Sequence, residues 1–309
     1  MGDTRGMQCG VSAECARKNR RPPGGINRRT VLAGAAALLP AAHARAANTA
    51  ASRLAAIEQR YGGRLGVVIL DTATGARMEH RADERFPMCS VFKLLAVAAV
   101  LRRVDAGQDS LDRRISYGTA DLLSYAPIAR AHVADGFMSL GALCAAALQW
   151  SDNTAGNLIL STIGGPEGGT RYARSVGDRL TRMDRTEPAL NTAIAGDPRD
   201  TTTPRAMLRD MRAILLGAAL SSASRRQLTD WLIGDRVGGQ RLRAGIPPSW
   251  RVGDKTGSGD NGTANTVGIL WPPDRAPILA SVFLTGSSPS LDTLNAAHAD
   301  VGRVLVSVM

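Results

Sequence analysis

The sequence predicts an α/β fold of the α+β type with two lobes. Strand-like runs occur near both ends of the chain, whereas the middle has apolar residues at helical spacing. We therefore expect one antiparallel five-stranded sheet built from both termini and flanked by helices, together with an all-helical lobe. An active site is expected in the cleft between the two lobes.

The elements of the first half follow in order. A short helix near residues 52–59 precedes two strands within residues 64–80, which join at the turn Thr72-Ala73-Thr74-Gly75. From Phe92 to about Ser224 the chain alternates Ala/Leu/Arg-rich stretches with loops rich in Gly, Asp and Pro. These stretches predict helices that include residues 94–104, 140–149 and 206–216.

Strand-like runs return at residues 250–255, 265–271 and 278–285. The chain then closes with an apolar stripe at helical spacing, formed by Leu291, Leu294, Val301, Val304 and Leu305. We therefore assign residues 47–85 and 233–309 to an α/β domain and residues 86–232 to a helical domain.

Residues 1–46 are predicted to be a twin-arginine signal peptide that is removed on export. The pair Arg28-Arg29 precedes an apolar run, residues 33–42, that is too short to span a membrane. Overlapping small-x-small cleavage sites follow at residues 42–46. A short N-terminal helix or a retained anchor is the alternative. We expect the twin-arginine export machinery as a partner and a periplasmic or secreted location.

The net charge of +11 falls to +5 once the leader is set aside, with 30 basic and 25 acidic residues remaining. The arginines are scattered along the sequence, which indicates a solvated surface and no nucleic-acid partner. Two cysteines remain, Cys89 and Cys144, and we expect buried free thiols, with a disulfide as the alternative. The four histidines are isolated, so neither a metal site nor another cofactor is predicted.

The chain contains only three lysines, and two of them lie in short motifs with serines. Lys93 follows Ser90 by three residues, and Lys255 opens the run Lys255-Thr256-Gly257-Ser258. Arginine keeps its proton in proteins, whereas a desolvated lysine can release one. These two positions therefore indicate proton chemistry.

Ser90 and Lys93 are predicted to form a nucleophile and its activator. Ser90 lies at the start of an apolar helix, where the helix dipole is positive, and Lys93 shares its face. The neighbouring apolar residues disfavour the charged lysine, so proton acceptance from the serine is plausible. Alone, the pair is also compatible with a capping serine and a solvated lysine.

Two further motifs complete a set, namely Ser151-Asp152-Asn153 and the segment Arg185-Thr186-Glu187-Pro188-Ala189-Leu190-Asn191. With Ser90, Lys93 and the Lys255 motif, the chain resembles a class A serine β-lactamase from about residue 50 to its C-terminus. The resemblance implies a monomeric hydrolase without cofactors that confers β-lactam resistance. Its small-molecule substrates would be penicillins and some cephalosporins, opened through an acyl-serine intermediate that a Glu-activated water resolves.

The resemblance also implies a role for each motif residue. Glu187, with Asn191, would hold the hydrolytic water on a loop closed by an ion pair from Arg185 to Asp200, although either Lys93 or Glu187 could be the acylation base. The leaving nitrogen would receive its proton through Ser151. Substrate would be bound by Asn153, Lys255, Thr256, Arg241 and Tyr125, and the oxyanion by the backbone N–H groups of Ser90 and Ser258.

Each of these residues, considered alone, also has a simpler structural interpretation. The Ser151 motif could cap a helix, Lys255 could be a solvated lysine on an edge strand, and Glu187 could be a surface carboxylate. Arg241 could likewise be a surface arginine and Tyr125 a packed loop aromatic. Where some relatives with a broad substrate range have a second cysteine for a disulfide with Cys89, this chain has Gly259, so that disulfide cannot form.

Two other functions share part of the motif set. A peptidoglycan carboxypeptidase or transpeptidase would use the same serine, lysine and Lys-Thr-Gly elements on D-Ala-D-Ala peptides. A non-enzymatic sensor would be acylated once and stay modified. The Glu187 segment favours the hydrolase, and the absence of a predicted membrane anchor disfavours the sensor.

Overall fold

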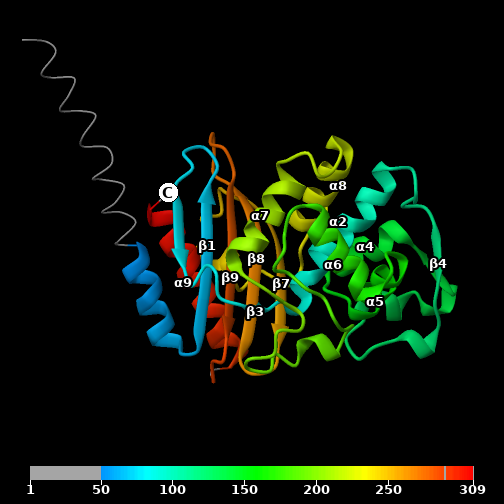
Figure 1. The fold of residues 1–309 in the computed structure, drawn as a ribbon, viewed down its shortest axis with the longest axis horizontal. Coiled ribbons are helices and arrows are strands. Elements are labelled where there is room, and N and C mark those ends of the chain that lie inside the picture. The colour runs from blue at the N-terminus through cyan, green and yellow to red at the C-terminus, as the bar shows by residue number, and fades with distance from the viewer. Residues whose placement is uncertain (1–49, 289, 309) are drawn as a thin grey trace, which may run out of the picture. The chain divides into compact units, whose positions relative to one another are not determined.

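A five-stranded antiparallel sheet is the centre of the fold, in the order β2-β1-β9-β8-β7. The computed structural model describes residues 50–288 and 290–308, and the predicted leader, residues 1–46, lies outside this part of the chain. The strands are β1 (Arg64–Asp71), β2 (Arg77–His80), β7 (Arg251–Gly259), β8 (Thr263–Trp271) and β9 (Ile278–Thr285). Strands from both ends of the described chain thus lie side by side (Figure 1).

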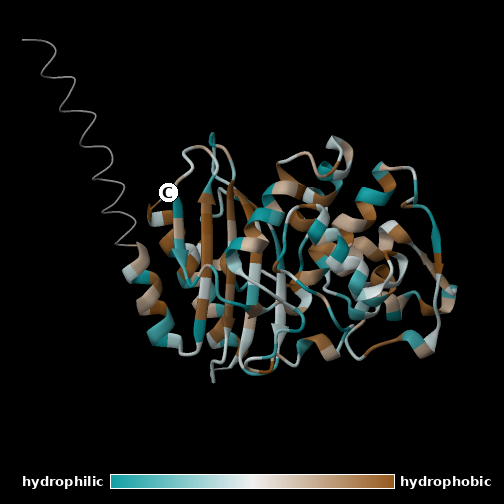
Figure 2. Ribbon diagram, in the orientation of Figure 1, coloured by the Kyte–Doolittle hydropathy of each residue, from teal (hydrophilic) through white to brown (hydrophobic). Residues whose placement is uncertain are grey.

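One face of the sheet is covered by helix α9 (Leu291–Val308) and a helix over residues 50–61. Their apolar side chains, such as Leu54 and Val301, share one buried cluster with Val67 of β1 and Leu284 of β9. Figure 2 shows β1 and β9 coloured largely as hydrophobic, whereas β7 is pale. The central strands therefore anchor the core, and β7 is free to carry polar residues.

The helical lobe lies on the β7 side of the sheet in Figure 1. Its central helix is α2, in which all ten residues from Phe92 to Leu101 are buried. Helix α2 spans Phe92–Asp105 and packs against α4 (Leu140–Gln149), α5 (Asn153–Thr162), α6 (Gly165–Ser175) and α8 (Ser222–Ile233). The short helix α3 (Pro127–Ala131) packs against α4, and α7 (Pro204–Leu215) packs against β1 and β9 of the sheet.

Short strands and 3-10 turns complete the fold. The pair β3 (Phe86–Pro87) and β6 (Thr201–Thr202) joins the segment before Ser90 to the segment after Glu187. A second pair consists of β4 (Arg114–Ser116) and β5 (Phe137–Ser139). Single 3-10 turns are η1 (Cys89–Val91), η2 (Thr119–Asp121), η3 (Val133–Asp135), η4 (Ala189–Asn191) and η5 (Leu242–Gly245).

The predicted fold class and sheet are confirmed. The strand-like run expected at residues 250–255 and the motif at residues 255–258, also expected to be a strand, form the single strand β7, which continues to Gly259 opposite Thr263. Glycine and serine carry little strand propensity, so tertiary pairing extends β7 through the motif. The domain boundaries after residues 85 and 232 stay predictions.

Cys89 and Cys144 are both buried free thiols, as expected. Burial raises the pKa of each thiol far above its usual range, because the thiolate would lose its solvation. Over residues 50–288 and 290–308, no helix is long and apolar enough to cross a membrane.

Candidate active site

A cavity of about 370 Å³ lies between the helical lobe and β7. Eight of the eleven predicted site residues line it: Ser90, Tyr125, Ser151, Asn153, Asn191, Arg241, Thr256 and Ser258. The other three, Lys93, Glu187 and Lys255, are buried against its lining residues through the contacts described below. The fold thus brings all eleven side chains to one crevice.

Ser90 belongs to η1, directly before the first residue of α2. It is only 7% exposed, and the preceding residue, Cys89, has a φ of 45° in the left-handed region. A non-glycine residue in this region costs about 1–3 kcal/mol and persists only where the surrounding structure enforces it. The backbone is therefore held in a strained form next to the serine hydroxyl.

The Lys93 ammonium lies 2.8 Å from Ser90 Oγ and is fully buried. It also donates to the Ser151 carbonyl at 2.8 Å and to Asn153 Oδ1 at 2.7 Å. Burial lowers the pKa of Lys93, because desolvation disfavours the ammonium, and Glu187 partly opposes this shift. The solvated-lysine reading is therefore wrong for this residue.

Glu187 approaches the same hydroxyl from the opposite loop. Ser90 Oγ donates to Glu187 Oε1 at 2.9 Å, and Lys93 Nζ lies 3.0 Å from that oxygen. Asn191 Nδ2 donates to the other carboxylate oxygen at 2.5 Å. With an exposed fraction of 3%, Glu187 is not a surface carboxylate.

Asn157 of α5 fixes the backbone of Glu187. Its Oδ1 accepts from the Glu187 N–H and its Nδ2 donates to the Glu187 carbonyl, both at 2.9 Å. Two hydrogen bonds from one amide to the main chain of a single residue fix both the position and the orientation of the Glu187 backbone. Asn157 therefore determines where the Glu187 carboxylate lies.

The expected ion pair closes the Glu187 loop. Arg185 Nε donates to Asp200 Oδ2 at 2.6 Å, and Asp200 Oδ1 accepts from the backbone N–H groups of Asp184 and Arg185 at 2.8 and 3.0 Å. Asp200 itself has a φ of 56°. Both ends of the loop are therefore joined by charge-assisted hydrogen bonds, which are stronger than neutral ones.

The Ser151 motif both caps a helix and lines the crevice. Asp152 is the N-cap of α5 and accepts from Ala155 N at 2.9 Å. Its second oxygen accepts from Ile128 N and Ala129 N. These bonds hold Ser151, whose φ is 56°, so that its hydroxyl accepts from Lys255 Nζ at 2.9 Å.

Lys255 is fully buried although β7 is the edge strand of the sheet, so its solvated reading is also wrong. Desolvation lowers its pKa to about 7, and the neighbouring Lys93 adds to the shift. Farther along β7, a methyl group on Gly257 would lie 2.8 Å from the Met88 carbonyl oxygen and 3.2 Å from Ser90 N. Glycine at position 257 thus lets β7 approach the nucleophile segment.

Arg241 is 5% exposed, which excludes the surface-arginine reading. Its Nη2 donates to Ser258 Oγ at 2.5 Å, and its Nε donates to Asn295 Oδ1 at 2.9 Å. Burial lowers the pKa of Arg241 to about 10, so it stays cationic at neutral pH. Tyr125 lies at the rim of the cavity and is 47% exposed, unlike a packed loop aromatic.

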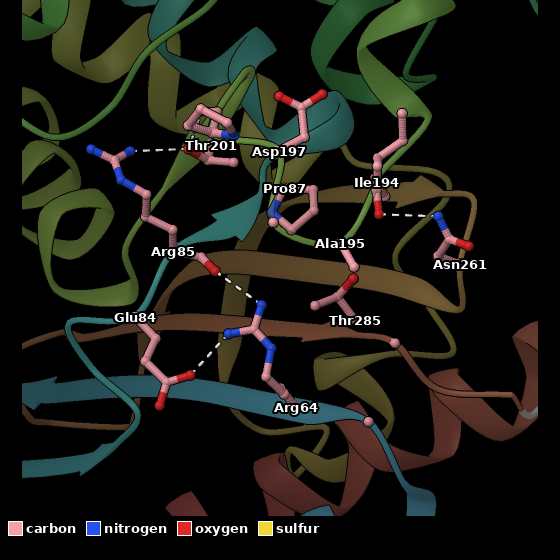
Figure 3. Close-up of a pocket in the computed structure, with 15 residues that line it drawn as sticks. Arg64, Glu84, Arg85, Pro87, Ile194, Ala195, Asp197, Thr201, Asn261 and Thr285 are labelled. Atoms are coloured by element: carbon pink, nitrogen blue, oxygen red, sulfur yellow. Dashed lines mark hydrogen bonds and ion pairs between the residues drawn. The ribbon is translucent and has the colours of Figure 1, made fainter.

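A larger cavity of about 590 Å³ lies elsewhere and contains none of the predicted site residues. Figure 3 shows that the segment around Ile194 and Asp197, from the loop that carries Glu187, forms one wall of it. The cavity thus lies against the part of the loop that follows Asn191. Among the described residues, no group of three or more His, Cys, Asp or Glu side chains could hold a metal ion.

Four residues at the site were not predicted from the sequence. Asn157 has a detectable signal, because it follows Asn153 by four residues and therefore shares its helix face. Asn295 is a polar residue beside the apolar stripe of α9, which is a weaker signal. Val237 and Leu291 also line the cavity, and nothing in their spacing indicates this.

Comparisons with known proteins agree with this geometry. A family model described as the Beta-lactamase enzyme family matches residues 49–309. Beta-lactamase CTX-M-25 of Escherichia coli is 48% identical over 259 residues, covering 84% of this chain and 89% of that protein. Beta-lactamase OXY-2 of Klebsiella oxytoca is 48% identical over 267 residues, covering 86% and 91%.

Solved structures of similar sequence have the same fold. An ancestral class A β-lactamase superposes with a TM-score of 0.83 at 55% identity, covering 84% of this chain and 100% of that one. The putative class A β-lactamase PenP from Rhodopseudomonas palustris has the same TM-score, identity and coverage.

Proposed function

The chain belongs to the class A β-lactamases, which hydrolyse a cyclic amide with a serine nucleophile, and from that premise we propose that its substrates are penicillins first, with some cephalosporins. The observation that carries the mechanism is the contact of one hydroxyl with two bases. Ser90 Oγ lies 2.8 Å from Lys93 Nζ and 2.9 Å from Glu187 Oε1.

Acylation begins when Ser90 Oγ attacks the lactam carbonyl carbon and loses its proton. Both Lys93 and Glu187 are within proton-transfer distance of Oγ, so either group can accept this proton. The developing oxyanion is stabilised by the backbone N–H groups of Ser90 and Ser258, and losing one such donor typically costs about 3–4 kcal/mol. Breakage of the C–N bond gives an ester on Ser90.

The leaving nitrogen receives its proton through Ser151. The Ser151 hydroxyl accepts from Lys255 Nζ at 2.9 Å, and its carbonyl accepts from Lys93 Nζ at 2.8 Å. These contacts support a relay in which a lysine resupplies the proton that Ser151 gives to nitrogen. Asn153 would bind the side-chain amide of the substrate.

The substrate carboxylate would be bound by Lys255 and Thr256, with Arg241 as a second cation. Arg241 Nη2 reaches this region through Ser258 Oγ, so that it polarises the hydroxyl beside the oxyanion donor. Because a hydroxyl at position 258 is also suited to a cephalosporin carboxylate, Ser258 supports the broader half of the substrate proposal. Tyr125 would form the mouth of the crevice.

Deacylation would use a water held by Glu187 and Asn191. Their contact of 2.5 Å keeps the carboxylate beside the ester position on Ser90. Glu187 would take a proton from this water, which then attacks the ester carbonyl and releases Ser90.

Resistance to β-lactams would follow from turnover outside the cytoplasm. We propose export of a monomer by the twin-arginine pathway to the periplasm or the medium, supported by the Arg28-Arg29 pair and the apolar run that follows it.

The test adds a chromogenic cephalosporin in large excess to the purified chain. Sustained colour is expected, whereas a stoichiometric burst that stops would instead indicate a peptidoglycan carboxypeptidase or a sensor. In the Glu187→Gln variant, penicillin should still label Ser90, and mass spectrometry should find the adduct persisting. Rapid multiple turnover by that variant would exclude Glu187 as the deacylation base.

A further inference from the structure

The fold gathers five arginines into one groove that is separate from the active site. This groove has a volume of about 550 Å³ and is lined by Arg85, Arg171, Arg174, Arg179 and Arg182. None of its lining residues lines the crevice of Ser90. Hydrolysis of a β-lactam does not account for it.

Arginine is concentrated here well beyond its average in the chain. Five of the ten residues that line the groove are arginines, and only two acidic residues, Glu167 and Asp184, lie among them. In the whole sequence, arginine accounts for about one residue in nine. The groove therefore has an excess of three positive charges, which is unfavourable in the absence of an anion.

Arg85 and Arg174 are held in place by backbone atoms. Arg174 Nη1 donates to the carbonyls of Asp178 and Thr181, both at 2.7 Å. Arg85 Nη1 donates to the Leu180 carbonyl at 2.9 Å and to a threonine hydroxyl, a bond that Figure 3 also shows. Each guanidinium thus uses one nitrogen as an anchor and keeps its Nε–H and Nη2 donors for another acceptor.

Two more arginines have weak partners or none. Arg179 is exposed and has no hydrogen-bond or ion-pair partner in the part of the chain that the structure describes. Arg171 lies 3.8 Å from Glu167, and this pair is 65% and 90% exposed, so it contributes little. By contrast, Nε and Nη2 of Arg182 both donate to the Asp184 carboxylate.

We propose that this groove binds a small anion that carries two or more phosphate groups. Guanidinium groups bind phosphate oxygens through two parallel hydrogen bonds, and an anchored guanidinium loses less entropy on binding than a free one. The volume lies in the range of small-molecule sites, about 300–1,000 Å³. Because the surface is concave, it suits a small soluble ligand better than a membrane.

The larger cavity in Figure 3 does not have these properties. Two arginines line it, namely Arg85, which also lines the groove of the five arginines, and Arg64, which is paired with Glu84 at 2.9 Å and donates to the Arg85 carbonyl. The Arg64 guanidinium is therefore neutralised within the chain. The unpaired positive charge lies in the groove of the five arginines.

The test measures binding of inorganic tripolyphosphate to the full chain by calorimetry at low salt. One bound ligand per chain is expected. The double variant R171A/R179A should bind it at least about tenfold more weakly, the equivalent of about 1.4 kcal/mol. The control R212A/R226A removes two exposed arginines of α7 and α8 and has the same net charge, so its affinity should stay close to that of the parent.

β-Lactam turnover and melting temperature should not change in either double variant, because neither pair lies in the crevice of Ser90. If R171A/R179A fails to fold, the single change Arg179→Gln replaces it, with an expected loss of at least about threefold. Absence of tripolyphosphate binding, or an equal loss in the control variant, would overturn the proposal.

Two further arms identify the ligand chemistry. Citrate, which has three carboxylates, should bind more weakly than tripolyphosphate, and equal binding would overturn the assignment to phosphate. Phosphatidylglycerol vesicles should not bind the chain through this groove. Vesicle binding that R171A/R179A abolishes, without binding of tripolyphosphate, would indicate a membrane surface and would also refute the proposal.

Discussion

Replacement of Asn157 by alanine should uncouple Glu187 from helix α5. The change removes two hydrogen bonds of 2.9 Å and leaves the N–H and the carbonyl of Glu187 without their partners. A buried group left unpaired costs about 1–3 kcal/mol. Because Asn157 is only half-buried, water can replace part of each bond, and we expect a loss of about 2–3 kcal/mol in the free energy of unfolding.

Part of this loss should appear in catalysis. If about 1.4 kcal/mol of it reflects the position of the Glu187 carboxylate, deacylation slows by about tenfold. Urea unfolding of the full chain gives the stability change, and single-turnover kinetics with a penicillin gives the deacylation rate.

Ser161→Ala is the matched control, since Ser161 is an exposed residue of the same helix and its hydroxyl bonds only to Leu158 within that helix. Its effect should stay within about 0.5 kcal/mol. The reasoning is refuted if Asn157→Ala loses no more stability than this control and deacylates at the parental rate.

Three further perturbations test the surroundings of the site. The Lys255 amine has a pKa of about 7 and loses its charge above that pH, so kcat/KM for a penicillin should fall as pH rises through 7. The Lys255→Arg variant keeps its charge and should not show this fall, and an identical fall in that variant would exclude Lys255 as the cause. Gly257→Ala places a methyl group 2.8 Å from the Met88 carbonyl oxygen, so it should cost about 1–3 kcal/mol of stability and lower kcat/KM. Gly118→Ala, with open space around it, should change neither thermal unfolding nor turnover, and an absence of effect at position 257 would contradict the close approach of β7 to the nucleophile segment. Burial lowers the pKa of His298 from 6.5 to about 3, so between these pH values the unfolded chain binds a proton that the folded chain excludes. The free energy of unfolding should therefore fall with decreasing pH by up to about 1.4 kcal/mol per pH unit, and the His298→Asn variant should lack this dependence. The same pH dependence in both proteins would refute the assignment to His298.

The strands and the motif residues could be predicted because their signals are local. β9 occupies the predicted residues 278–285, and α4 the predicted residues 140–149. The last residue of β7, Gly259, could not be predicted as strand, since only its partner Thr263 on β8 places it in the ladder. Local propensity is overridden there by pairing with a neighbouring strand.

That the motif residues lie together in one site could be expected only from the resemblance to the class A β-lactamases, because spacing in the sequence does not show which distant residues come into contact. Ser90 and Glu187 are separated by 97 positions and still share a hydrogen bond. Asn157 was missed because a single polar residue on a helix is common and its partner is a backbone group. The arginine groove was missed for a related reason: arginines scattered in sequence were interpreted as a solvated surface, and the fold places five of them together.

The position of β1 has a consequence for synthesis of the chain. Val67 of β1 pairs with His80 of β2 on one side but with Val282 of β9 on the other, so the longer of its two ladders forms only after β9 has been synthesised. Until then, a nascent chain whose helical lobe has already left the ribosome still exposes the unpaired backbone edge of β1. Because the pairing of β1 with β9 joins distant parts of the chain, it slows folding and prolongs the interval in which chaperones can act. A chain that lacks β9 cannot complete the sheet and should be degraded by proteases.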